Sequence, residues 1–245
     1  MGSLSDAGPE QLRLLSQAVR ERAAGARTLD AAAQILTDEF YDRFGDSTVL
    51  IRVFVTIPFR ATPAAVQQFV RGLIANHPSI PPLRDDTTIL ALMGTRGALP
   101  AWNSRLKSKG HLGIPLASPE FVGAIPMVSR LLSELGVSIE GTGGSEQYVS
   151  RVIGNLSGVF HVADARTARD AERRPIIAAQ DFVAAHDVRS VFGFGGAYML
   201  ERSFAVVIVF TRETIAKEQA ERFAPLASAF KTATMAVAAE GRFFS

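Results

Sequence analysis

One stretch of the chain gathers residues that could bind an anionic or aromatic small molecule. It reads RGALPAWNSRLKSKGHLGIP and contains the only tryptophan, Trp102. Arginine offers a planar fork of donors to an anion, and an indole ring offers a flat apolar face. No acidic residue lies between Asp86 and Glu120, so we expect a locally positive potential here although the net charge is only +2. The loop residues of the predicted ligand site are Arg96, Trp102, Asn103, Arg105, Lys109 and His111.

The alternative interpretation of this stretch is a solvated basic loop that a single tryptophan anchors. Its glycines and prolines argue against a regular element and predict a long ordered loop. Long loops of compact domains are usually either functional or disordered. Recurring apolar residues argue against disorder and therefore favour function: Leu99, Trp102, Leu106, Leu112 and Ile114.

A second stretch, SVFGFGGAYMLERSFAVVIVF, contains glycines spaced as in some phosphate-binding loops. Such a loop follows a strand and opens a helix, whereas here a short turn and a second apolar run follow. The stretch therefore predicts an antiparallel hairpin. Phe192 and Phe194 alternate with Gly193 and Gly195, so one face of the strand is aromatic and the other is bare. Protein or a flat ligand should lie against the bare face, and we add Phe192, Phe194 and Gly195 to the predicted ligand site.

Several classes of chemistry are excluded by composition. The chain of 245 residues has no cysteine, which rules out disulfides, thiolate catalysis and cysteine-ligated metals, and fits a cytoplasmic location. The four histidines lie in separate segments and no G-x-S-x-G motif occurs, so we predict neither catalytic residues nor a metal site. The near-neutral charge argues against a nucleic-acid binder. No apolar run reaches the roughly 20 residues of a membrane span.

Hydrophobic periodicity predicts two opening helices and then a strand. Apolar residues recur at spacings of three and four from Leu12 to Ala26 and from Leu29 to Phe44, as one face of a helix requires. The run from Thr48 to Phe59 is largely β-branched. Because Arg52 and Thr56 share one of its faces, it predicts a strand in a sheet that is covered on only one face.

The remaining pattern alternates between short helices and strands. Ser118 and Pro119 are typical of a helix start, and Pro126 should kink that helix. The segment GTGGSE at 141–146 is expected to be flexible. The expected helices are 62–74, 118–135, 146–156, 176–186 and 212–239, and the expected strands are 87–94, 158–165, 188–198 and 203–210.

Both ends of the chain resemble GAF domains, the small-molecule sensor modules of bacterial signalling proteins. The resemblance lies in LLSQAVRERAAGARTLDAAAQILTDEFYDRFGDSTVLIRVF and in VRSVFGFGGAYMLERSFAVVIVFTRETIAKEQAERFAPLASAFKTATMA. It implies an α+β fold with a central, mostly antiparallel sheet, terminal helices on one face and a large helical and loop insertion. We therefore expect a single GAF-like domain over 1–245 with an insertion at about 58–188. No chromophore-attachment signature is found, so the cofactor is unknown.

The resemblance also implies a function, a non-catalytic sensory or regulatory module that binds a small molecule of unknown identity. The stripes of the terminal helices could pack against the chain's own sheet or form a seam with another subunit. We expect a homodimer through these helices, and a histidine kinase or other signalling output domain as a possible partner. Two alternatives stay open: an enzyme acting on an anionic small substrate through the Arg96–His111 loop, and a protein-interaction module without a ligand.

Overall fold

The computed structural model describes residues 2–75, 77, 81–108, 110–141, 148–152, 158–198 and 203–245. The helices are α1 (Pro9–Ala24), α2 (Leu29–Phe44), α3 (Ala64–Ala75), α4 (Pro119–Gly123), α5 (Pro126–Glu134), α6 (Gln180–Ala185), α7 (Lys217–Glu221) and α8 (Ala224–Ala239). Three short 3-10 turns are η1 (Phe59–Ala61), η2 (Pro100–Trp102) and η3 (Arg105–Lys107). The strands are β1 (Thr48–Pro58), β2 (Thr88–Gly97), β3 (Gly113–Pro115), β4 (Val137–Gly141), β5 (Tyr148–Val152), β6 (Gly158–Val162), β7 (Ser190–Tyr198) and β8 (Ser203–Thr211).

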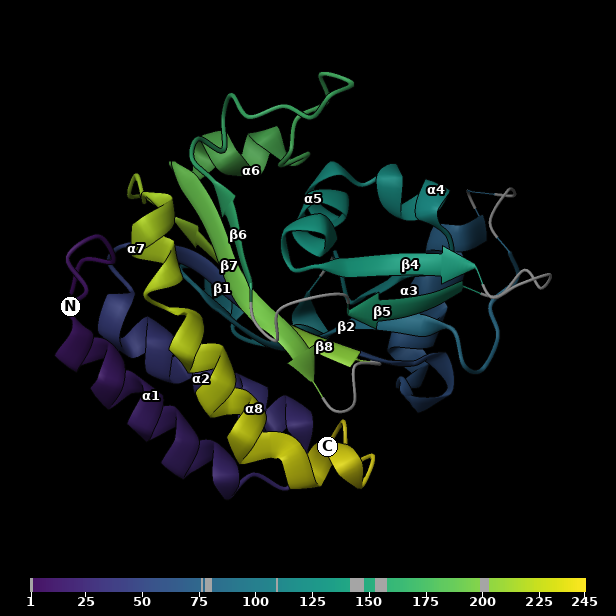
Figure 1. Cartoon of the computed structure of the whole chain (residues 1–245), viewed down its shortest axis with the longest axis horizontal. Helices are drawn as coiled ribbons and strands as arrows, with labels where there is room; N and C mark the ends of the chain where they lie inside the picture. The colour runs from purple at the N-terminus through teal and green to yellow at the C-terminus, as the bar shows by residue number, and fades with distance from the viewer. Residues whose placement is uncertain are drawn as a thin grey trace.

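Six of these strands form one sheet in the order β3-β2-β1-β8-β7-β6 (Figure 1). Every neighbouring pair in it is antiparallel, and β4 pairs with β5 in a separate ribbon. The predicted α+β fold with a mostly antiparallel central sheet is therefore confirmed. The stretch 58–188 supplies β2, β3 and β6 to the sheet. A single domain with an insertion at about 58–188 stays a prediction.

One face of the sheet, here called the helix face, is covered by α2 and α8, and α1 packs on both of these helices (Figure 1). Phe223, just before α8, is the centre of an aromatic cluster. Its ring centroid lies 5.7 Å from Phe40, 5.8 Å from Phe44, 5.3 Å from Phe192 and 6.1 Å from Phe194. All of these side chains are buried. The cluster thus joins α2, β7 and the entry to α8 in one core.

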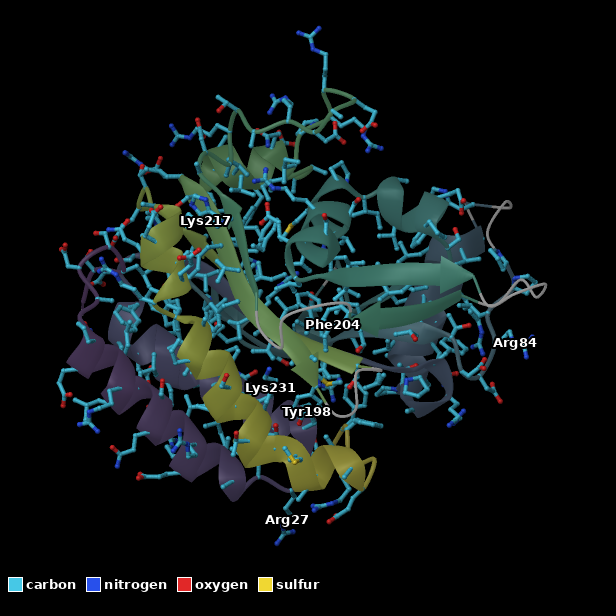
Figure 2. The ribbon with its side chains drawn as sticks, in the orientation of Figure 1. Arg27, Arg84, Tyr198, Phe204, Lys217 and Lys231 are labelled. Carbon is cyan, nitrogen blue, oxygen red and sulfur yellow. The ribbon has the colours of Figure 1, made fainter. Side chains whose placement is uncertain are left out.

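Polar contacts hold α8 to the end of β7. Figure 2 shows Tyr198 and Lys231 near each other there. The hydroxyl of Tyr198 lies 2.6 Å from Thr234 Oγ1, and Lys231 Nζ donates to Ala197 O at 3.0 Å. Burial raises the pKa of Tyr198 to about 12, so this phenol stays protonated at neutral pH.

The apolar stripes of the terminal helices are buried inside the chain. Leu15 and Val19 of α1, and Leu226 and Phe230 of α8, are almost inaccessible to solvent. These stripes therefore serve the core of the subunit itself. A homodimer through the terminal helices stays a prediction, and it would have to use outward residues such as Met235, whose exposed fraction is 57%.

The opposite side of the sheet, here called the second face, is also covered, so the expectation of a half-covered sheet is wrong. Leu50 and Phe54 of β1 pack there in a second apolar cluster. That cluster includes Leu116 after β3, Leu131 of α5 and Val183 of α6. The central strand β1 is consequently packed on both faces, and Arg52, its one charged residue, is half-buried.

Three local predictions need correction. The segment expected as a helix at 146–156 contains β5, and its aromatic and β-branched residues favour a strand. The helix expected at 118–135 is two helices, since Pro126 has no N–H to continue the first. The last helix is likewise divided, into α7 and α8.

Ser118 caps α4 as predicted, its Oγ accepting from Phe121 N at 3.2 Å. The flexible segment expected at 141–146 lies outside the described residues apart from Gly141.

Close approach of the backbone explains the glycines of β7. A Cβ on Gly195 would lie 2.2 Å from the carbonyl oxygen of Ala205 on β8, and one on Gly193 would lie 2.8 Å from the carbonyl oxygen of Val207. The nearest group to each glycine is thus the main chain of the neighbouring strand in the same sheet. That protein rather than a flat ligand lies against the bare face stays a prediction. Gly94 of β2 has the same role on the helix face, where α2 passes 2.5 Å from its would-be Cβ.

We predict that Gly195→Ala lowers the free energy of unfolding by about 1–3 kcal/mol, the usual cost of overpacking. The matched control is Gly72→Ala on α3, where a Cβ would meet nothing within 4 Å. Alanine is the better helix former by about 1 kcal/mol, so the control should hold or gain stability. Urea unfolding followed by circular dichroism measures both. If the urea midpoint of Gly195→Ala equalled that of the wild type, the close approach of the β8 main chain to Gly195 would be contradicted.

Candidate functional site

Arg52 is the charged residue that β1 places on the second face. Its neighbours Leu50 and Phe54 belong to the second apolar cluster, and alternate residues of a strand share a face. Across the sheet Arg52 lies opposite Thr95 of β2 and Ile208 of β8. The side chain therefore starts from the middle of the sheet, among apolar residues.

The guanidinium of Arg52 is short of partners. Its Nη2 donates to Ser108 Oγ at 3.3 Å, while its Nε is buried without a hydrogen-bond partner among the residues described. Across that same part of the chain no carboxylate lies at ion-pair distance from it. Burial lowers the pKa of Arg52 to about 10, which still leaves it protonated at neutral pH. A desolvated cation without a counter-ion is unfavourable, so this position suits an anion.

Hydrogen bonds to β2 position the basic loop beside Arg52. Thr95 Oγ1 donates to Trp102 O at 2.9 Å, and Gly97 N donates to Asn103 Oδ1 at 3.0 Å. At the far end of the loop Leu92 N donates to Leu112 O at 3.0 Å. Asn103 thus pins the loop to the sheet through its side chain, and the residues between the two anchors can reach the second face.

Ser108 contacts Arg52, and His111 lies close enough for the charge of Arg52 to act on it. The hydroxyl of Ser108 donates to Gly110 O at 2.7 Å, which leaves its lone pair to accept from Arg52. The pKa of His111 lies below its ordinary value, because surrounding protein desolvates the ring and the positive charge of Arg52 opposes a second one. Its imidazole is therefore neutral at pH 7. The residue nevertheless keeps an exposed surface, so it lies at the rim of the site.

Trp102 links the basic loop to α6. Its ring centroid lies 5.5 Å from Phe182 and 4.8 Å from His186, both in edge-to-face geometry. The indole also covers Gly97, where a Cβ would lie 2.8 Å from its Cε3. Trp102 and Ile114 are anchors as expected, whereas Leu99 and Leu106 are exposed and do not anchor the loop.

The two arginines predicted to hold a ligand pair with α2 instead of facing Arg52. Arg105 Nη2 lies 2.7 Å from Asp30 Oδ2, and both side chains are largely buried. Arg96 Nη1 lies 3.6 Å from Asp38 Oδ1, and its guanidinium lies 5.6 Å from the ring centroid of Tyr41. The positive charge of the loop is thus partly balanced by carboxylates from the second helix.

The remaining predicted residues are divided between the two faces. Phe192 and Phe194 are fully buried in the helix-face core, and Gly195 lies beside the carbonyl of β8. Lys109 lies outside the described residues. Trp102, Asn103, Arg105 and His111 belong to one loop, in which the side chain of Arg105 faces Asp30 of α2. Phe192 and Phe194 lie apart from this loop in the helix-face core.

Sequence reasoning missed Arg52 as a site residue. The signal was present, since a lone arginine interrupts an otherwise apolar strand in TVLIRVFVTIP. In sequence such an arginine indicates a solvent-facing side, because a single sequence does not show that a second layer covers that face. Among the described residues there is no group of three or more histidine or acidic side chains that could hold a metal ion. Within the same residues no helix is both long and apolar enough to cross a membrane.

Comparisons with known proteins identify the fold. No family model matches the chain, and no curated protein matches it. The free methionine-R-sulfoxide reductase from Neisseria meningitidis, solved in complex with its substrate, is similar with a TM-score of 0.51 and 10% identity over 98% of each chain. The GAF domain of a phosphoenolpyruvate-protein phosphotransferase (ptsP) from Coxiella burnetii is similar with a TM-score of 0.50 and 12% identity, over 96% of this chain and 99% of that one. At such identities the likeness shows the fold alone, and by its fold the chain is a GAF-like domain.

Proposed function

We propose that the protein is a non-catalytic regulatory module that binds a small anionic molecule on the second face of the sheet. One observation carries the proposal: Arg52 is half-buried on a central strand, and its buried Nε has no hydrogen-bond partner among the described residues. A carboxylate or phosphate placed there would supply the missing counter-charge and accept charge-assisted hydrogen bonds. Ser108 and the neutral imidazole of His111 would complete the polar contacts.

The fold is compatible with this role, because one protein of similar fold was solved with its substrate bound. The chain itself has no cysteine and therefore no thiol with which to reduce a sulfoxide. An enzyme working through the Arg96–His111 loop is less well supported, since Arg96 and Arg105 are paired with Asp38 and Asp30. A module without a ligand would leave the burial of Arg52 unexplained.

The wider setting belongs to the same proposal. We take the protein to act in bacterial signal transduction in the cytoplasm, with a homodimer contact on the outer side of the terminal helices. A histidine kinase or another output domain would receive the signal. The supports for this setting are the GAF-like fold, the lack of cysteine and the exposed Met235 of α8.

A binding experiment tests the anion site. A thermal-shift screen of phosphate, sulfate, carboxylic acids, nucleotides, cyclic nucleotides and flavins is followed by titration calorimetry of each hit. Arg52→Gln should weaken binding by roughly 10- to 100-fold, since a charge-assisted hydrogen bond contributes about 1.5–3 kcal/mol and each 1.4 kcal/mol is a decade. The matched control is Arg96→Gln, on the neighbouring strand but facing α2, which should bind as wild type. Equal affinities for Arg52→Gln and wild type would refute the site.

A stability experiment separates a binding arginine from a structural one. Without ligand, Arg52→Gln should keep or raise the free energy of unfolding, because it removes a buried charge that has no counter-ion. Arg105→Gln should lower it by about 1.5–3 kcal/mol, because it removes charge-assisted bonds to Asp30. Urea unfolding at pH 7 measures both. A large loss for Arg52→Gln would mean that Arg52 serves the fold rather than a ligand.

A further inference from the structure

The basic loop makes contacts in two directions between its anchors on β2. Toward the second face, Ser108 accepts from Arg52. Toward α2, Arg105 donates to Asp30 through Nε at 3.1 Å and Nη2 at 2.7 Å. The two contacts belong to a single 3-10 turn, since Arg105 begins η3 and Ser108 N donates to Arg105 O at 3.1 Å. A turn this short moves as a unit, so a shift at Ser108 is transmitted to Arg105.

Asp30 also holds the last residues of the chain. Leu29 N donates to Arg242 O at 2.9 Å and Asp30 N donates to Phe243 O at 3.0 Å, so tail carbonyls cap the first N–H groups of α2. Ser245 N donates to Asp30 Oδ1 at 3.2 Å. The residues 242–245, here called the C-terminal tail, therefore lie directly on the start of α2.

Arg105 touches the C-terminal tail as well as Asp30. Its guanidinium lies 4.7 Å from the ring centroid of Phe244, a cation–π distance. The side chain of Asp30 has an exposed fraction of 6% and that of Arg105 one of 12%, so the pair is little screened by solvent. The carboxylate of Asp30 accepts hydrogen bonds from both the basic loop and the C-terminal tail. A change in its contact with one of them therefore alters its contact with the other.

We propose that Arg105 couples the anion site at Arg52 to the C-terminal tail. An anion on Arg52 replaces the hydrogen bond from Arg52 to Ser108, η3 relaxes, the Arg105–Asp30 pair weakens, and the tail loosens from α2. This inference rests on the proposed function for its ligand, but the mechanical link can be tested without one. Because coupling is reciprocal, a variant that loosens the tail should bind the anion more tightly.

The first test uses hydrogen exchange of the full chain in the absence of any anion ligand. Ser108→Ala removes the contact with Arg52 and should speed exchange of the C-terminal tail and the first turn of α2 by about fivefold or more, the lower end of typical couplings. Lys107→Ala, an exposed change within the same turn, is the matched control and should exchange as wild type. Arg105→Gln removes the contacts of Arg105 with Asp30 and Phe244 directly. The increase in its tail exchange rate is therefore the largest that the coupling can produce. Wild-type tail exchange in Ser108→Ala, with fast exchange in Arg105→Gln, would overturn the coupling.

The second test adds inorganic phosphate as the probe, with binding measured in parallel by calorimetry. Phosphate should speed tail exchange in wild type and leave Arg52→Gln unchanged. If phosphate binds at Arg52 while the tail exchanges as before, the coupling is overturned and the proposed function stands. If phosphate does not bind, the anion site loses its support, and the Ser108→Ala result alone decides whether the loop and the tail are linked.

Discussion

The placement of the half-buried Arg52 on a sheet that is covered on both faces is the constraint around which the second face is arranged. A central strand between two apolar layers has no place for a charge unless a partner is brought to it. Among the described residues the group that reaches Arg52 is the hydroxyl of Ser108 and not a carboxylate, and its Nε has no partner there. That shortage is the observation behind the proposed anion site.

The helix α2 balances the charge that the sequence concentrates elsewhere. Its carboxylates at Asp30 and Asp38 pair with Arg105 and Arg96, so these two arginines are held to the helix. The same helix rests against the backbone of Gly94, which lets it approach the sheet closely. The basic loop is therefore neutralised on the side of α2 and left cationic on the side of Arg52.

The proposed ligand site and the part proposed to respond to it both lie within reach of one loop. The anchors at Thr95, Gly97 and Leu92 fix the two ends of the loop to β2. Between them, one turn touches Arg52 on one side and Asp30 on the other. A fold shared with a methionine-R-sulfoxide reductase and a phosphotransferase GAF domain does not assign a function by itself, so the proposal depends on this local arrangement.

The sequence alone determined the elements with strong periodicity, because their hydrophobic spacing does not depend on distant contacts. The stripes from Leu12 and Leu29, the strand from Thr48 and the glycine hairpin with its antiparallel pairing are all present, and they carry the GAF-like α+β fold. The prediction for 146–156 was wrong, because its aromatic and β-branched residues favour the strand β5 that pairs with β4.

The candidate site was decided by tertiary structure. Whether Arg52 faces water or a second layer depends on segments from β3 to α6, which lie far away in sequence. Whether Arg105 is free depends on Asp30, 75 residues earlier in the chain. A single sequence shows the charge and spacing of such residues. Burial and pairing arise only when the chain folds. They distinguish Arg105, which is paired with Asp30, from Arg52, whose Nε has no partner among the described residues.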